Sequence, residues 1–122
     1  MPEILEEGTF EPDGFAEELA AAPANLDVGT TLWLENERVR VWEVRLDPGT
    51  RCPFHAHTRP YVWTCVGAGT GRQRSPDGTL KVRRYAEGDT QFSAHTGGKP
   101  MLHDLENVGD TVLRFVTVEL LG

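Results

Sequence analysis

Two of the chain's four histidines, His55 and His57, stand one residue apart in the stretch PGTRCPFHAHTRPYVWTC. The surrounding residues are typical of a β-strand, and side chains two apart on a strand project from the same face. Both imidazoles would then reach one metal ion. An H-x-H pair also occurs on solvated strands, so two polar surface residues are the competing interpretation.

A third histidine, His103, lies in HDLEN, and Asn107 follows it four residues later. On a strand His103 and Asn107 share a face, whereas Asp104 points the other way. Strands that are distant in sequence come together in a closed barrel. His103 is therefore a candidate to complete a three-imidazole set with His55 and His57.

The chain after residue 30 has the pattern of a β protein. Short runs rich in Val, Leu, Trp and Arg alternate with turn signals such as DPG, GAGTG and SPDG. Turns spaced roughly ten residues apart, with no helical periodicity between them, indicate an all-β sandwich or barrel. We expect strands near 31–35, 38–46, 52–57, 61–66, 71–75, 79–85, 90–95, 102–107 and 111–120.

The first 29 residues form an acidic leader before a barrel domain at 30–122. All twelve Lys and Arg residues lie after position 37, whereas ten of the nineteen acids lie at or before it. Residues 1–12 show no periodicity and predict a loop. PDGFAEELAAAPAN predicts a short helix capped by Asp13 and ended by Pro23, with Phe15 and Leu19 on one apolar stripe that docks on the barrel. The acidic face is either solvated or covers arginines of the barrel or of a partner subunit.

Composition limits the classes of function. A net charge of −7, with an acidic leader on a mildly basic body, argues against nucleic acid or an anionic membrane as partner. No apolar run approaches the roughly 18 residues of a membrane span, and the start lacks the basic residues of a signal peptide. We therefore expect a soluble, cytoplasmic protein. Two cysteines are too few for a disulfide framework.

The two histidine segments resemble the two motifs of the cupin superfamily. The first motif, G-x5-H-x-H-x3-E-x6-G, is matched by GTRCPFHAHTRPY as far as the second histidine. The second motif, G-x5-P-x-G-x2-H-x3-N, is similar to GDTQFS…HDLENVGD at its glycine, histidine and asparagine. The resemblance covers roughly residues 30–121. It implies a cupin double-stranded β-helix (jelly-roll) barrel, commonly a homodimer. It also implies a divalent transition metal (Fe, Zn, Ni or Mn) held in the barrel mouth by His55, His57 and His103.

The sequence departs from these motifs at two places. Tyr61 stands where the first motif has its glutamate. A phenol is a poor ligand for most divalent metals, so Tyr61 is a direct ligand, a hydrogen-bond donor to a metal-bound water or substrate, or a packed aromatic. The second departure is the segment AHTGGKPML at 94–102, about four residues longer than the motif. It carries His95, a candidate fourth ligand, a proton shuttle at the rim, or an exposed loop residue.

Several other residues are candidate lining of a pocket. Aromatic residues near the motifs are either core or an apolar wall, and polar residues such as Gln91 and Ser93 would anchor a ligand if their strand face points inward. Arg59, just after H-x-H, either steers a carboxylate at the mouth or is a surface arginine. The full set of predicted pocket residues is Phe54, Trp63, Gln91, Phe92, His95 and Asn107.

Three imidazoles without a carboxylate leave coordination positions open for a ligand. Within the resemblance, three-histidine cupins include thiol dioxygenases and diketone-cleaving dioxygenases. The prediction is a metal-dependent enzyme of dioxygenase or isomerase type acting on a small organic molecule. The alternatives are a non-catalytic cupin that binds or senses a small ligand or metal, and a structural barrel that binds no metal.

Overall fold

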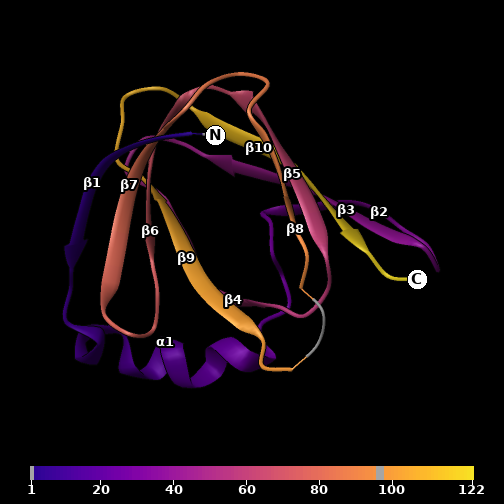
Figure 1. The fold of residues 1–122 in the computed structure, drawn as a ribbon, viewed down its shortest axis with the longest axis horizontal. Helices are drawn as coiled ribbons and strands as arrows, with labels where there is room; N and C mark the ends of the chain where they lie inside the picture. Colours follow the sequence, from indigo (N-terminus) through magenta and orange to yellow (C-terminus); the bar gives the residue numbers. More distant parts are fainter. Residues whose placement is uncertain (1, 96–97) are drawn as a thin grey trace.

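The computed structural model describes residues 2–95 and 98–122, and within these ranges ten strands form two five-stranded antiparallel sheets (Figure 1). One sheet has the order β1-β7-β6-β9-β4 and the other β2-β3-β10-β5-β8. The prediction of an all-β barrel with a short N-terminal helix is confirmed. The strands are β1 (Glu3–Thr9), β2 (Thr31–Glu35), β3 (Val39–Leu46), β4 (Arg51–His57), β5 (Tyr61–Gly67), β6 (Gly69–Arg74), β7 (Thr79–Tyr85), β8 (Thr90–Ser93), β9 (Met101–Asn107) and β10 (Leu113–Leu120).

The prediction of a loop over residues 1–12 was wrong, because Glu3–Thr9 is strand β1. This strand pairs antiparallel with β7, and every one of its residues is exposed. Its acidic side chains meet the basic side chains of β7, with Glu3 at 2.8 Å from Arg84 and Glu7 at 3.7 Å from Lys81. Pairing with a distant strand therefore builds an element that has no apolar periodicity of its own.

The predicted helix is present in a shorter form. Its α-helical part, α1 (Ala16–Ala21), lies between 3-10 turns at Pro12–Phe15 and Ala22–Ala24. Asp13 lies inside the first of these turns and does not cap the helix, and Pro23 lies inside the second rather than ending the helix. The expected docking is confirmed for Phe15, whose ring lies 5.6 Å from that of Phe54 on β4.

The N-terminal segment covers the open edge of β4, the strand that carries His55 and His57. The Asn25 carbonyl accepts a hydrogen bond from the Ala56 N–H (2.8 Å), and the Glu18 carboxylate accepts one from the Phe54 N–H (2.8 Å). In Figure 1 the segment passes beneath the ends of β4 and β9. An uncovered edge is a site of unwanted strand pairing, so the leader satisfies backbone groups beside the candidate site.

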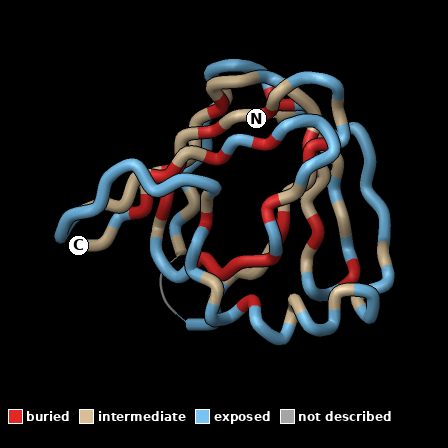
Figure 2. The backbone as a smooth tube through the Cα atoms, turned by 180° about the vertical axis from the view of Figure 1, so that it is seen from behind, coloured by how far each residue is buried: buried red, intermediate tan, exposed pale blue. Residues whose placement is uncertain are grey.

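The main core lies between the two sheets. Val44, Leu46, Cys65, Leu113 and Phe115 are buried there in one cluster. Figure 2 shows buried stretches turned toward the inside of the barrel, while the outer loops are exposed. Among the described residues, no helix is both long and apolar enough to cross a membrane.

Candidate metal centre

The three candidate histidines come from two paired strands. β4 runs antiparallel to β9, and this register places His55 directly opposite His103. His57 follows two residues later on the same face of β4. The structure therefore brings together the three imidazoles that the motifs single out, two of them buried and His103 half-buried.

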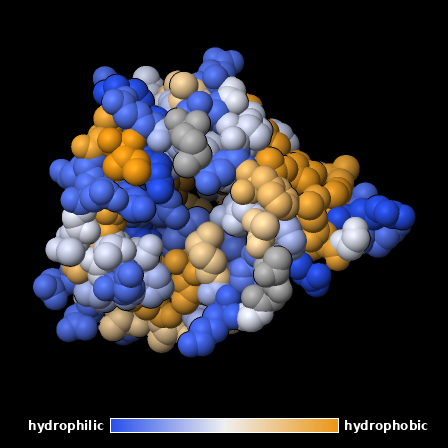
Figure 3. All heavy atoms as spheres, viewed as in Figure 1, coloured by the Kyte–Doolittle hydropathy of each residue, from blue (hydrophilic) through white to orange (hydrophobic). Residues whose placement is uncertain are grey.

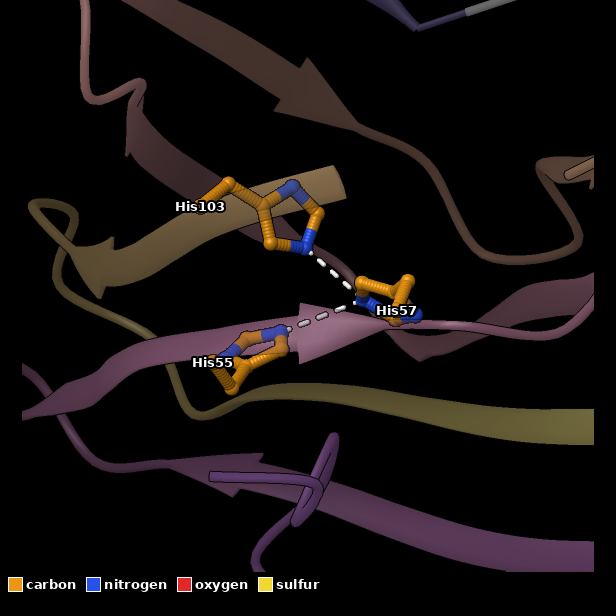
Figure 4. A group of neighbouring side chains, drawn as sticks. All are labelled: His55, His57 and His103. Carbon is orange, nitrogen blue, oxygen red and sulfur yellow. Dashed lines mark hydrogen bonds between the residues drawn. The ribbon is translucent and has the colours of Figure 1, made fainter. Parts of the chain in front are cut away.

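The three Nε2 atoms converge on one point (Figure 4). Nε2 of His57 lies 3.1 Å from Nε2 of His55 and 2.9 Å from Nε2 of His103. Two nitrogens bound to one ion at about 2.0–2.1 Å are about 2.8–3.4 Å apart when they subtend 90–109° at the metal. Small movements of the rings would therefore place an ion within bonding distance of all three nitrogens, so the donor set fits a divalent transition metal.

The hydrogen bond of His55 favours metal binding. Its Nδ1 lies 2.8 Å from the Pro53 carbonyl, which can only accept, so Nδ1 carries the proton and Nε2 presents a lone pair to the cluster. Nδ1 of His57 is buried, and none of the described residues forms a hydrogen bond with it. A metal ion bound between the three rings would accept the lone pairs of the Nε2 atoms of His55, His57 and His103.

His103 has a different neighbour. Its Nδ1 contacts the side-chain amide of Gln73, whose Oε1 accepts a hydrogen bond from Arg83 Nη1 (2.9 Å). The Gln73 atom that faces Nδ1 is the amide nitrogen, which is a donor. A metal-bound His103 carries its proton on Nδ1, so the amide would have to turn its oxygen toward His103 and share that oxygen with Arg83. Gln73 thus connects the histidine cluster to an arginine.

Burial keeps the imidazoles neutral, which is the form that binds metals. Loss of solvation is the main cause in each case. It lowers the pKa of His55, lowers that of His57 to about 3 with help from His55 and His95, and lowers that of His103 well below its ordinary value of 6.5.

Tyr61, at the motif's glutamate position, packs against the cluster. Its ring stacks on that of His57, with centroids 4.0 Å apart and an angle of 18° between the ring planes. Burial raises the pKa of the Tyr61 phenol, an effect that Ser93 opposes, so the hydroxyl stays protonated at neutral pH. The structure thus shows the packed aromatic, and the role as hydrogen-bond donor to a ligand stays a prediction.

A cavity of about 260 Å³ opens beside the three histidines. Of the predicted pocket residues, Trp63 and Gln91 line it. Trp63 contacts Tyr85 and Phe115 edge-to-face, with ring centroids 5.6 and 5.5 Å apart, and these three rings form an apolar wall. The wall makes one side of the cavity apolar, while polar side chains such as those of Gln73, Arg83 and Gln91 line other parts of it.

Four predicted pocket residues lie outside this cavity. Phe54 is next to His55 in sequence, but its side chain points to the opposite face of β4, where Phe10 and Phe15 cover it. Phe92 is 55 % exposed, because it alternates with Gln91 on β8. His95 does not line the cavity, although its charge contributes to the low pKa of His57. Thr96 and Gly97, in the predicted 94–102 insertion, lie outside the described residues.

Asn107, the fourth of these residues, is a structural residue. It is fully buried, and its Nδ2 donates to the carbonyls of Leu46 (2.8 Å) and Thr111 (2.7 Å). Its own carbonyl accepts from the N–H of Gly49 (3.0 Å), which has a φ of 83°, a value that favours glycine. The glycine of the first motif and the asparagine of the second therefore meet at one turn.

Among the cavity residues that were not predicted are Gln73, Arg83, Tyr85 and Thr117. Alternation along TLKVRRY puts Arg83 and Tyr85 on one face of β7, but the sequence does not say which face points inward. Arg59, the arginine that sequence reasoning considered, is exposed and donates to the Leu121 carbonyl (3.3 Å). The arginine of this cavity is therefore Arg83.

No protein-family model and no curated protein matches the chain. Among solved structures, a cupin domain from Bordetella pertussis Tohama I is similar, with a TM-score of 0.64 and 28 % identity over 74 % of this chain and 88 % of that one. A double-stranded β-helix protein of the RmlC-like cupin family from Methanocaldococcus jannaschii has a TM-score of 0.59 and 17 % identity, over 74 % of this chain and 76 % of that one. The DMSP lyase DddQ from Ruegeria pomeroyi DSS-3 has a TM-score of 0.51 and 18 % identity, over 70 % of this chain and 39 % of that one.

The fold and the arrangement of the two motifs define a cupin barrel. The chain belongs to the cupin superfamily, which confirms the resemblance of its two motifs.

Proposed function

We propose that the protein is a metal-dependent cupin enzyme in which His55, His57 and His103 hold a divalent transition metal (Fe, Zn, Ni or Mn). The observation that carries this proposal is the convergence of three neutral Nε2 atoms beside a cavity. The substrate would be a small organic molecule, because the cavity of about 260 Å³ is below the usual 300–1,000 Å³ of ligand pockets.

A bound metal with three protein ligands supplies open positions for a substrate and the polarising effect of a Lewis acid. The chain's own residues would place that substrate. The wall of Trp63, Tyr85 and Phe115 excludes water from one side, and Gln91 offers a polar contact at another. The ring of Tyr61 holds the imidazole of His57 in position. Dioxygenase-type or isomerase-type chemistry is the class of reaction that we propose.

A non-catalytic ligand-binding or metal-sensing role is the second candidate, and one observation favours it. Asp104 is the only acidic residue among the described residues that line the cavity, and its carboxylate points to the opposite face of β9 from His103. It accepts hydrogen bonds from Arg51 Nε (2.8 Å), and from Arg74 Nη1 and the Arg74 N–H (both 2.8 Å). A carboxylate engaged in this way is a poor general base, so the cavity offers no free acid for proton transfer.

Metal analysis tests the proposal. Untagged protein, stripped with a chelator and dialysed against Fe(II), Zn(II), Ni(II) or Mn(II), should retain about one equivalent of at least one metal. His57→Ala should lose it. His95→Ala is the matched control and should retain it, because His95 does not line the cavity. Less than about 0.1 equivalent in the wild-type protein would rule out the metal site.

Oxygen consumption then separates the two candidate functions. Iron-loaded protein would be incubated with a panel of thiols, diketones and small acids in an oxygen electrode, and substrate loss followed in parallel. Oxygen uptake with one substrate class supports a dioxygenase, and substrate conversion without uptake supports an isomerase. Metal binding with neither result would favour the binding or sensing role.

We also propose that the chain forms a homodimer through β2. This strand is at the edge of its sheet, and Leu32, Trp33 and Leu34 are 42 %, 51 % and 50 % exposed. Hydrophobic residues gather on the side of the molecule where β2, β3 and β5 lie (Figure 3). An exposed apolar edge strand is a surface that a second copy of the chain would cover.

A further inference from the structure

The cavity beside the histidines contains a cation that no carboxylate neutralises. Within residues 2–95 and 98–122, no carboxylate oxygen lies within 4.0 Å of the Arg83 guanidinium. Its neighbour Arg84 differs, because it points outward and pairs with Glu3 at 2.8 Å. Arg83 is half-buried and lines the cavity.

The position of Arg83 is fixed by the strands around it. β7 carries Arg83 opposite Gly71 of β6 and opposite Ile4 of β1. The hydrogen bond from Nη1 to Gln73 Oε1 (2.9 Å) holds the guanidinium beside the amide that contacts His103. The bond to Gln73 and a side-chain hydrogen bond to Tyr85 leave three of the five N–H donors of the guanidinium for another partner.

The charge in the cavity is strongly one-sided. Three neutral imidazoles leave both positive charges of a divalent ion uncompensated, and Tyr61 stands where a carboxylate would reduce that charge. Asp104, the one acidic residue of the cavity lining within the described ranges, directs its carboxylate to Arg51 and Arg74 on the opposite face of β9. Arg83 adds a further positive charge to the same cavity. Such a site favours a negatively charged ligand, because attraction is strong in a partly desolvated cavity.

We propose that Arg83 is the anion-recognition residue of this cavity, and that its ligand is a small organic carboxylate. The carboxylate would pair with the Arg83 fork while a second donor atom of the ligand reaches the histidine cluster. This proposal rests on the proposed metal site for its second contact, but the contact with Arg83 can be tested without the metal. Planar, two-point pairing with carboxylates is the geometry that arginine provides and lysine does not.

Calorimetry with malonate and succinate, each compared with its uncharged diamide, tests this proposal. Co(II)-loaded wild-type protein should bind at least one dianion ten times more tightly than its diamide, and metal-free protein should keep the preference more weakly. Arg83→Gln should weaken dianion binding about tenfold to a hundredfold, the range for a charge-assisted pair. Arg83→Lys should give an intermediate loss.

Arg84→Gln is the matched control, because it removes an adjacent arginine on the outer face and should leave dianion binding unchanged. Bound cobalt, measured in every variant, serves as the test of an intact site. The proposal is overturned if wild-type protein binds the diamides as tightly as the dianions, or if Arg83→Gln with full cobalt binds dianions like the wild type. Failure to bind cobalt, with the dianion preference retained, would instead overturn the proposed metal function.

Discussion

At the scale of single residues, Tyr61 is the residue that sets the proposed metal site apart from the four-ligand motif. It replaces a carboxylate with an aromatic ring that stacks on His57 at 4.0 Å. The exchange removes a negative ligand and adds a rigid wall that orients one of the remaining ligands. Groups that orient a metal-binding histidine affect metal affinity even when they do not touch the metal.

Tyr61→Phe should leave the Zn(II) dissociation constant within about twofold of the wild-type value, because the stacked ring is retained. Tyr61→Ala should raise it by about tenfold, since outer contacts of metal ligands are worth 10–100-fold in affinity. Competition with a chromophoric chelator measures both constants. A tenfold loss in Tyr61→Phe would mean that the hydroxyl itself binds the metal.

Asn107 links the turn that precedes β4 to the turn that follows β9, so its prediction concerns stability. Asn107→Ala would leave buried groups without their partners, including the carbonyls of Leu46 and Thr111. We expect the free energy of unfolding to fall by about 3 kcal/mol, since each unsatisfied buried group costs about 1–3 kcal/mol. Urea unfolding of metal-free protein measures this change.

Asn36→Ala is the control for Asn107. Asn36 accepts hydrogen bonds from the N–H groups of Arg38 and Val39 in an exposed turn. Water can replace these bonds, so the expected loss is below about 1 kcal/mol. Equal losses in the two variants would contradict the structural role given to Asn107.

The sequence indicates the ligands better than it indicates the pocket. Residue type and spacing single out His55, His57 and His103, because strand alternation puts the first two on one face. The same alternation argues against Phe54 as a pocket residue, because its side chain lies on the opposite face of β4 from His55. The role of Arg83 was not predictable, because nothing in TLKVRRY tells which face of the strand turns inward. That choice depends on pairing with β1 and β6, which are distant in sequence.

The N-terminal segment acts on the site at the scale of elements. It covers the edge of β4, and its Glu18 carboxylate contacts both Arg51 and the Phe54 N–H. Of the two interpretations of the acidic leader, coverage of the barrel's basic residues is what the structure shows at Glu18, Glu3 and Glu7. The contacts of Glu18 join the leader to β4, which carries His55 and His57, whereas those of Glu3 and Glu7 join it to β7.

Glu18→Gln should lower stability at pH 7 by about 1 kcal/mol, as expected for a partly exposed ion pair. The hydrogen bond from Arg51 lowers the pKa of Glu18 below its ordinary 4.5. The contribution of Glu18 is therefore present above about pH 4.5 and is lost as the pH falls through the lower folded-state pKa. Urea midpoints between pH 7 and pH 3 should show a smaller acid-induced loss in Glu18→Gln than in the wild type.

Glu17→Gln is the matched control for this prediction. Glu17 is exposed on the same helix and makes no ion pair with the described residues. Its midpoints should follow those of the wild type at every pH. If the two variants behave alike, the contact of Glu18 with β4 does not stabilise the fold.

The sequence predicted nine of the ten strands close to their observed bounds, since turn residues and β-rich runs mark them locally. The exception, β1, consists of EILEEGT, which has neither alternation nor an apolar face. Its strand conformation comes from its partner β7, and such non-local pairing is not visible in a local pattern. The helix cap failed for a similar reason, because the chain enters α1 through a 3-10 turn in place of a side-chain cap.

At the scale of the whole molecule, the exposed residues of β2 predict a dimer. Trp33→Glu should shift the mass measured by light scattering after size exclusion from two chains to one, because a charge in an apolar interface is costly. Phe92→Glu is the control, since Phe92 is equally exposed but lies on β8 at the far edge of the same sheet. A wild-type protein that elutes as a monomer at all concentrations would contradict the proposal.

The central claim is that the barrel holds one metal ion between three imidazoles. Crystals of Zn(II)-loaded protein, measured on both sides of the zinc absorption edge, test it most directly. The structure predicts one anomalous peak about 2.0–2.1 Å from Nε2 of His55, His57 and His103. Protein that carries one equivalent of zinc but shows the peak at other residues, or shows no peak at the three histidines, would contradict the account.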